Sequence, residues 1–297
     1  YQTTSTGTVV FTVTETGTWT ITAQQGGQST SGQVNVTAAT NYSITLSFVD
    51  STLNNNDWST ISEVSDASQG ANYWSVGDRK QVTLNGTMSK LALSNYSTYA
   101  FILGFNHNSS REGSGRIHFQ IGKTALSGGK DICLVSGYSN DSDFYMNTSN
   151  TNSGGWEDSY MRNNILGTSK TSYSGKFIGV LPSALRNVLK SVTKYTDNTG
   201  NSSTSSSAVT ATTDYAFLLS EYEVFGSCTY ANSSEASRQQ QYAYYSAGNS
   251  KIKYNHSSTG SAIYWWLRSP CRSNSAGFVR VNNGGGVGSN GASRSYG

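Results

Sequence analysis

The residue types that carry most enzyme chemistry are sparse in this chain and lie far apart. The three histidines, His107, His118 and His256, form no HxH, HxxxH or HExxH pattern. No GxSxG pattern occurs, and glycines 284–286 are followed neither by a helical pattern nor by the Lys and Ser or Thr of a phosphate-binding loop. The sequence therefore predicts no catalytic residue, no metal site and no cofactor.

Carboxylates and cysteines add no recognisable catalytic set. Glu221 and Glu223 are expected on one face of a strand, which is equally the pattern of a solvated strand. Cys133, Cys228 and Cys271 lack CxxC spacing, and an odd number leaves at least one unpaired. We expect buried, unpaired thiols, whereas a close pair of Cys133 and Cys228 in an open cleft would indicate an enzyme.

The composition narrows the class of partner. Only 12% of the residues are charged, the net charge is +3, and no run of Lys or Arg occurs, so the electrostatic footprint of a nucleic-acid-binding protein is missing. The surface is instead rich in Ser, Thr, Asn, Gly and Tyr, as in many extracellular recognition proteins. No run approaches the roughly 20 apolar residues that span a bilayer. Because the chain begins at Tyr1, we expect that it does not start at its natural N-terminus.

The first 49 residues have the pattern of an all-β module. Four short segments between residues 8 and 48 alternate apolar residues with Thr, Ser, Gln or Asn, and turn residues separate them. We therefore expect residues 1–49 to form a small immunoglobulin-like β-sandwich that acts as a spacer and lacks its first strand.

Residues 50–297 show a mixed pattern. Strands are expected around residues 82–84, 99–105, 117–121 and 132–135. One helix is expected from Trp156 to Ile165, and a second from Pro182, with Leu185, Val188, Leu189 and Val192 on its buried face and Lys190 and Lys194 near its end. Residues 197–213 are expected to form a long exposed loop because they are nearly free of apolar residues. The predicted fold class is α+β.

Several ordered motifs in this second part resemble those of one protein family. They are 70–78 (GANYWSVGD), 105–108 (FNHN), 146–162 (MNTSNTNSGGWEDSYMR), 181–196 (LPSALRNVLKSVTKYT), 219–226 (LSEYEVFG), 241–253 (QYAYYSAGNSKIK) and 265–270 (WWLRSP). They resemble C-type-lectin-fold variable proteins of gut Bacillota and their phages, many of which are targets of diversity-generating retroelements. The resemblance implies a C-type-lectin-like (formylglycine-generating-enzyme-like) domain with two helices and twisted antiparallel sheets.

In that family WWLRSP opens a variable region, here about 264–297, in which a fixed frame alternates with rewritten positions. The frame would be Trp265, Trp266, Leu267, Arg268, Ser269, Pro270, Phe278, Val281, Val287 and Ala292, with Arg268 pairing with a carboxylate or carbonyls below the surface. The ligand-binding positions would be Cys271, Ser273, Asn274, Ala276, Gly277, Arg280, Asn282, Gly284, Gly286, Gly288, Ser289, Asn290, Ser293, Arg294 and Tyr296.

The residue content of this region supports the variable-surface hypothesis independently. Rewriting the adenines of AAY codons gives NNY codons, which cannot encode Lys, Glu, Gln, Met or Trp, and all five are absent from residues 271–297. An ordinary Gly- and Asn-rich loop is the alternative explanation. The remaining Tyr, Ser, Gly, Asn and Arg are the residues that antibody-like binding surfaces favour.

These features together predict a non-enzymatic receptor-binding protein of a phage tail or a bacterial surface. Its partner would be a bacterial cell-surface protein or glycan, and its location the virion or the cell exterior. A homotrimer or attachment to other tail proteins is left open. The alternative function is an enzyme of the formylglycine-generating or oxidase type, because the same fold includes such enzymes.

Overall fold

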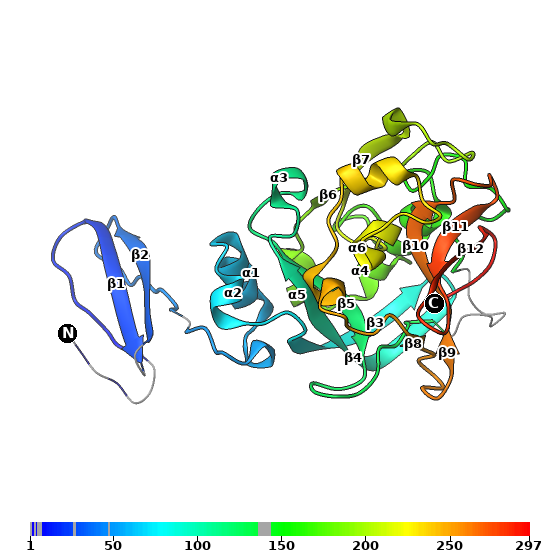
Figure 1. Ribbon diagram of the computed structural model, residues 1–297. Coiled ribbons are helices and arrows are strands. Elements are labelled where there is room, and N and C mark those ends of the chain that lie inside the picture. The colour runs from blue at the N-terminus through cyan, green and yellow to red at the C-terminus, as the bar shows by residue number, and fades with distance from the viewer. Residues whose placement is uncertain (1, 3, 5–7, 26–27, 47, 136–143) are drawn as a thin grey trace. The chain divides into compact units, whose positions relative to one another are not determined.

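The chain divides into two compact units, Tyr1–Asp50 and Ser51–Gly297. The computed structural model describes residues 2, 4, 8–25, 28–46, 48–135 and 144–297 (Figure 1). Among them, no helix combines the length and the apolar character needed to cross a membrane.

The first unit contains a single β-hairpin within the described residues. Strands β1 (Gly17–Gln25) and β2 (Gln28–Val36) pair antiparallel, with Trp19 opposite Val34. The expected four-stranded immunoglobulin-like sandwich is wrong for this part of the chain. Phe11, on the expected first strand, stays 46% exposed, and the Tyr42 hydroxyl binds the backbone N–H groups of Thr37 and Ala38, which folds that segment into a turn. No second sheet covers the hairpin there.

The second unit begins with helices and a three-stranded sheet. Helix α1 (Trp58–Asp66) starts at Asp57, whose side chain accepts a hydrogen bond from the Thr60 N–H, and is followed by the short helix α2 (Gly70–Tyr73). Strands β3 (Arg79–Met88), β4 (Leu91–Phe105) and β5 (Ile117–Lys123) form an antiparallel sheet with β4 in the centre. Three of the four predicted strands are confirmed, whereas residues 132–135 form no strand beyond an isolated bridge between Ile132 and Tyr254. Phe101 in β4 is fully buried.

Both predicted helices are much shorter than their patterns indicated. Residues 153–158 form turns, and only the π-helix η2 (Met161–Leu166) follows them, so Trp156 is buried without lying in a helix. Helix α5 (Ser183–Val188) ends at Leu189, and Val192 already belongs to the next strand. Leu185 is buried as predicted, whereas Val188 and Leu189 are only half-buried. Strand pairing by the β-branched residues that follow overrides the helical spacing.

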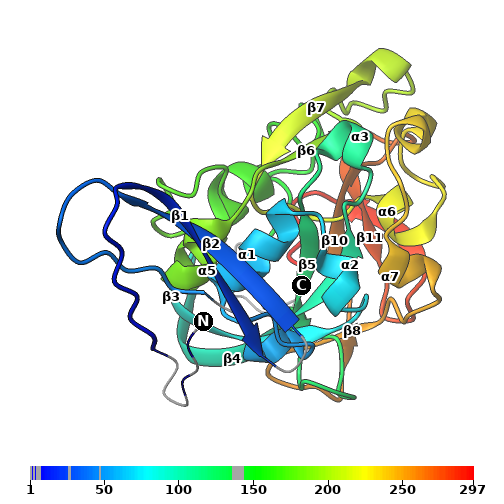
Figure 2. The same ribbon diagram turned by 90° about the vertical axis from the view of Figure 1, so that its left-hand side faces the viewer.

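The expected exposed loop at residues 197–213 is confirmed only for residues 198–205, several of which are exposed, and is wrong for both ends of the segment. Strands β6 (Val192–Asp197) and β7 (Val209–Asp214) pair antiparallel over their whole length, with Val192 opposite Asp214. Threonines and valines favour strands, and Thr212 and Asp214 point into the interior. Figures 1 and 2 both show this hairpin extending away from the β3–β4–β5 sheet.

Residues 221–297 supply short helices and the C-terminal sheet. These elements are α6 (Glu221–Phe225), η4 (Ser233–Ser237), α7 (Ala243–Ser246), β8 (Lys253–Tyr254), β9 (Ala262–Ile263), β10 (Trp265–Pro270), β11 (Gly277–Val281) and β12 (Val287–Gly291). The sheet has the order β10-β11-β12. The remaining short elements are η1 (Leu53–Asn55), α3 (Ser109–Glu112), α4 (Phe177–Val180) and η3 (Ser206–Ala208). The fold is therefore α+β, with several small antiparallel sheets and few helices.

Candidate ligand-binding surface and the ion network beneath it

The C-terminal sheet is built on a buried strand. Every residue of β10 is buried, and β11 places Phe278, Val279 and Val281 in the interior. The predicted frame is thus confirmed as buried, except that Val287 is only half-buried. These residues hold the sheet in place by packing in the interior. The segments that connect its strands, residues 271–276 and 282–286, form the more exposed part of the region.

The predicted ligand-binding positions fall into three groups by exposure. Ser273, Asn274, Gly284, Gly286 and Arg294 are exposed. Ala276, Arg280, Asn282, Ser289, Asn290 and Ser293 are half-buried. Cys271, Gly277, Gly288 and Tyr296 are buried, so the expectation that they present side chains to a ligand is wrong.

Close packing explains why three of these four positions are buried. The Cys271 sulfur contacts the Ser273 hydroxyl and the Asn274 amide at 3.2 Å. At Gly277, a Cβ atom would lie 2.5 Å from a backbone oxygen on β12, so a side chain does not fit there. A Cβ at Gly288 would lie 3.0 Å from the Arg280 guanidinium. Neighbouring groups fill the space at Cys271 and Gly277, whereas a side chain at Gly288 would have to displace the flexible end of Arg280.

Tyr296 is the largest correction, because it was expected to be an exposed aromatic contact. It is 2% exposed, and its ring packs against Trp266 and Tyr264 with centroid separations of 4.8 and 5.3 Å. Its hydroxyl contacts the side-chain amide of Asn290, and its N–H donates to the carbonyl of Phe144. Tyr296 therefore belongs to the frame.

Substitutions at Tyr296 and Arg294 should distinguish a buried frame residue from an exposed ligand-binding position. Tyr296→Ala is expected to lower the free energy of unfolding by about 3–5 kcal/mol, as other buried aromatic truncations do. Arg294→Ala should change it by less than about 0.5 kcal/mol, because the side chain is exposed and the bonds of this residue to Trp266 and Gly291 are made by its backbone. Urea denaturation of both variants measures the difference. Equal losses would contradict the assignment of Tyr296 to the frame.

The exposed positions gather at two ends of the β11–β12 hairpin. Loop 271–276 lies at one end together with Ser293 and Arg294, since the Ala292 N–H donates to the carbonyl of Ala276. Turn 282–286 lies at the other end, about 17 Å away along the five residues of β11. Between them Arg280 lies over the Tyr264 ring, with 4.1 Å to its centroid. The exposed positions therefore do not form one compact cluster.

Loop 271–276 is held mainly from outside the variable region. The fully buried Asn152 donates from its amide nitrogen to the carbonyls of Cys271, Asn274 and Gly277, at 3.2, 2.9 and 2.9 Å. Its own N–H donates to the carbonyl of Ser275. Because these bonds end on backbone oxygens, they are compatible with many side chains at positions 273–276.

Turn 282–286 is held in a different way. The Asn282 side-chain oxygen accepts hydrogen bonds from the N–H groups of Gly284 and Gly286, both at 2.9 Å. The turn thus depends on one of its own side chains, as Asx-type turns do. We therefore assign Asn282 to the structure of the turn and regard loop 271–276 as the part best suited to variation.

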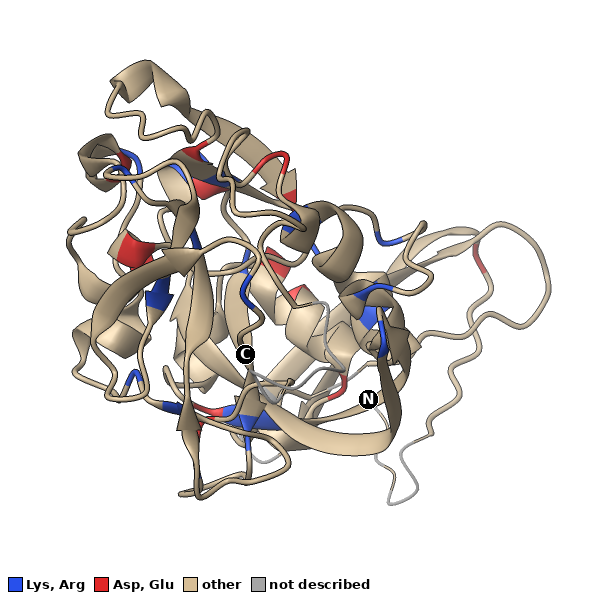
Figure 3. Cartoon of the chain, turned by 90° about the vertical axis from the view of Figure 1, so that its right-hand side faces the viewer, with Lys and Arg blue, Asp and Glu red and all other residues tan. Residues whose placement is uncertain are grey.

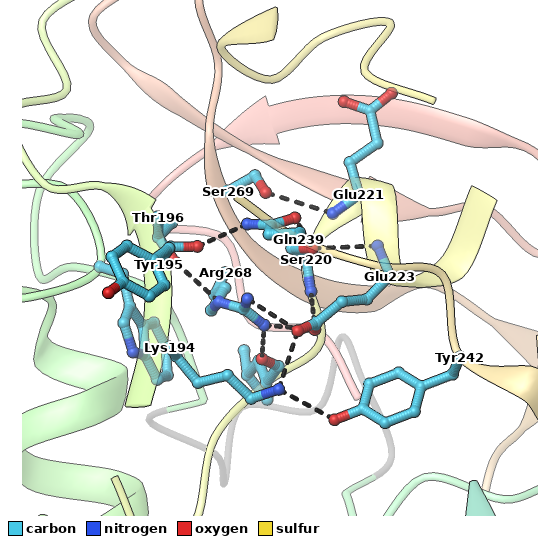
Figure 4. A network of polar contacts seen from close by, with 12 residues as sticks. Lys194, Tyr195, Thr196, Ser220, Glu221, Glu223, Gln239, Tyr242, Arg268 and Ser269 are labelled. Atoms are coloured by element: carbon cyan, nitrogen blue, oxygen red, sulfur yellow. Dashed lines mark hydrogen bonds and ion pairs between the residues drawn. The ribbon is translucent and has the colours of Figure 1, made fainter. Parts of the chain in front are cut away.

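A network of buried charges lies under strand β10 (Figure 4). The Arg268 guanidinium pairs with both carboxylate oxygens of Glu223, at 2.5 and 2.9 Å, which confirms the prediction that it meets a carboxylate. The Lys194 ammonium donates to Glu223, Glu112 and the Tyr242 hydroxyl at 2.9, 2.6 and 2.9 Å. Burial opposes the charge of Glu223, but Arg268 and Lys194 outweigh it and hold the pKa of this carboxyl well below its usual range.

This network was missed in the sequence, where Lys194 was expected at a helix end and Glu221 and Glu223 on a strand. Lys194 lies in β6, and both glutamates lie in helix α6 and are fully buried. The Glu221 carboxylate accepts hydrogen bonds from the N–H groups of residues 229–231. One signal was present: Ser220 followed three residues later by Glu223 is a helix capping box, and the structure forms it.

Among the residues that the structure describes, His107, Glu112 and Glu223 form a group that could hold a metal ion, with one donor atom each within 4.8 Å of the others. The Lys194 ammonium already bonds to both carboxylates, so a cation of the chain occupies this position. Burial, followed by the charge of Lys194, lowers the pKa of His107 to about 3. We assign the cluster to the support of β10 rather than to metal binding.

The cysteines are three free thiols. Burial raises the pKa of both Cys133 and Cys228 to about 12, which disfavours the thiolate that nucleophilic chemistry requires. Residues 264–297 contain four arginines and no acidic residue. Figure 3 shows how sparsely charged residues are spread over the whole chain. An exposed Arg294 beside loop 271–276 therefore favours polar or anionic groups on a ligand.

Comparison with known proteins gives a family but no activity. No curated protein and no solved structure matches the chain. Residues 130–297 match the model of a family described as a domain of unknown function (DUF6273), and this match includes Asn152, Lys194, Glu223 and the whole C-terminal sheet. Since it covers more than half of the sequence, the chain belongs to the DUF6273 family.

Proposed function

We propose that this chain is a non-enzymatic binding protein that presents loop 271–276, Ser293 and Arg294 as a sequence-variable recognition surface. Its ligand would be a protein or glycan on a bacterial cell, and it would act on a phage tail or a bacterial surface. Its second unit would be a C-type-lectin-like domain whose variable region a retroelement rewrites. The resemblance of the WWLRSP segment and the NNY-compatible residue content support this proposal.

The observation that carries the proposal is the way Asn152 holds loop 271–276. A surface that must accept many sequences needs a backbone whose shape is set by residues outside it. Here a buried amide from residue 152 binds three carbonyls of the 271–277 segment, while the side chains of Ser273 and Asn274 face solvent. The small polar residues of the loop adapt their hydrogen bonds readily, as in antibody loops.

The recognition role can be tested on cells. The fluorescently labelled full chain should bind a subset of strains in a panel of gut Bacillota, measured by flow cytometry. A variant with Ser273, Asn274, Ser275 and Arg294 all changed to Ala should lose that binding at least tenfold. Its melting temperature should fall by no more than about 4 °C, because the changed side chains are exposed.

A matched variant of the first unit provides the control. Changing Thr18, Thr20, Thr22 and Gln24 on the exposed side of β1 to Ala should leave cell binding as it was. Binding that survives the loop variant, or binding to no strain, would contradict the proposal. The genomic neighbourhood tests diversification separately: an imperfect, adenine-rich repeat of codons 264–297 beside a reverse transcriptase is expected.

A further inference from the structure

A largely apolar cavity of about 330 Å³ lies within the second unit. Its walls come from helices α1 and α5, π-helix η2, strand β5 and segments 132–135 and 215–219, with the β10 tryptophans on one side. None of its lining residues belongs to loop 271–276. The volume falls in the range of small-molecule binding sites in proteins.

Apolar side chains on the cavity wall keep part of their surface accessible. Ile117, Phe119 and Ile121 on β5 are half-buried, although they are large and lie within the compact unit. Val188 and Leu189, at the end of α5, are half-buried on the same cavity. Covering this surface with an apolar ligand is favourable because it removes hydrocarbon from water.

One charged group on the cavity has no hydrogen-bond acceptor. Lys253 is 3% exposed, and its ammonium makes no hydrogen bond within the described structure. It lies 5.0 Å from the centroid of a Trp265 ring and 5.9 Å from that of Phe101, which gives cation–π contacts but no hydrogen-bond acceptor. The nearby Asp131 already pairs with Lys123. An ammonium has three donors, and leaving them all unused in the interior is unfavourable.

A second unused donor lies on the same cavity. The buried His118 has its Nδ1 atom 2.7 Å from the Tyr242 hydroxyl, and that hydroxyl accepts from Lys194. The hydroxyl hydrogen can therefore go to Nδ1, which leaves the ring proton on Nε2. This Nε2 atom has no partner in the described structure. The cavity thus combines apolar walls with one unpaired cation and one unpaired neutral donor.

We propose that this cavity binds an amphipathic carboxylic acid, with its apolar chain against β5 and α5 and its carboxylate accepting hydrogen bonds from Lys253. A singly charged carboxylate matches a single buried ammonium. Two other cations lie at the wall: Arg116 donates to the carbonyls of Ser114 and Ser191, and Lys190 pairs with Asp66. Of these three wall cations, Lys253 is the one whose donors have no acceptor within the described residues, so one carboxylate suffices for it. This inference does not depend on the proposed recognition surface.

Calorimetry of the full chain with decanoate and with decan-1-ol, both below their aggregation limits, tests the proposal. Decanoate should bind saturably at one site, and decan-1-ol at least tenfold more weakly, because only the acid satisfies Lys253. Lys253→Met keeps the length of the side chain without its charge, and should weaken decanoate binding at least tenfold while leaving decan-1-ol unaffected.

Lys251→Met is the matched control, since Lys251 does not line the cavity, and it should bind decanoate like the unmodified chain. Equal affinity of the unmodified chain for acid and alcohol, no saturable binding of decanoate, or unchanged decanoate binding by Lys253→Met would overturn the proposal. If Lys253→Met does not fold, the affinities of the unmodified chain for decanoate and for decan-1-ol still test the proposal, because equal affinities would overturn it.

Discussion

Replacing Glu223 with Ala is expected to lower the free energy of unfolding of the second unit by at least about 3–5 kcal/mol. Glu223 is fully buried and is the common partner of Arg268 and Lys194. Breaking a buried ion pair by removing one member costs this much because the other charge stays in the interior without compensation. Here two cations lose their partner at once.

Thermal melting measures this effect. The melting temperature of Glu223→Ala is expected to fall by on the order of 10 °C, given the size of the second unit. Glu63→Ala in helix α1 is the control, because that carboxylate is exposed, and it should change stability by less than about 0.5 kcal/mol. Glu223→Gln keeps the shape but not the charge, so it should be nearly as damaging as Ala. If Gln restores full stability, the ionic explanation is wrong.

The second large effect is expected at Asn152. Asn152→Ala removes the amide that holds the carbonyls of Cys271 and Asn274, and should cost about 2–3 kcal/mol, since buried acceptors lose their donor. The carbonyl of Gly277 keeps a second donor, the Cys271 N–H, and contributes little to the loss. Hydrogen exchange of the peptide covering residues 268–280 should become faster as the loop loosens.

Asn274→Ala is the matched comparison, with the same substitution made inside the loop. Its side chain is exposed, accepts one hydrogen bond from the Ala276 N–H and makes a weak contact with the Cys271 sulfur, so the cost should be below about 1 kcal/mol. Losses of the same size for the two variants would mean that the loop depends on its own side chains. Such a loop could not be rewritten freely.

Local apolar patterns predicted the parts of the fold whose partners are near in sequence. The run at residues 101–103 gave the central strand β4, and WWLRSP gave the buried strand β10. The helix expected from Pro182 was cut short because Val192 pairs with Asp214, which the helical spacing could not show. The strand patterns around Phe11 and Tyr42 predicted a sandwich, but among the described residues they find no partner strand.

The polar interior could not be predicted for a related reason. Arg268 was expected to meet a polar partner below the surface, but Lys194 and Glu223 come from two other segments, and each alone resembles a solvated surface residue. Only their convergence compensates their charges and lets them be buried. Within the variable region, the prediction of an exposed side chain was right for Ser273 and wrong for Tyr296. An aromatic residue at this position can either contact a ligand or fill the space beside Trp266, and the sequence does not distinguish the two.

Two matched libraries displayed on yeast test the central claim most directly. The first library has NNY codons at six loop positions: Ser273, Asn274, Ser275, Ala276, Ser293 and Arg294. The second has NNY codons at six frame positions: Trp266, Leu267, Arg268, Phe278, Val281 and Ala292. The fraction of each library that resists protease is then counted. Most of the first library should stay resistant and almost none of the second, because the frame and Asn152 carry the fold. Similar loss of resistance in both libraries would contradict the account.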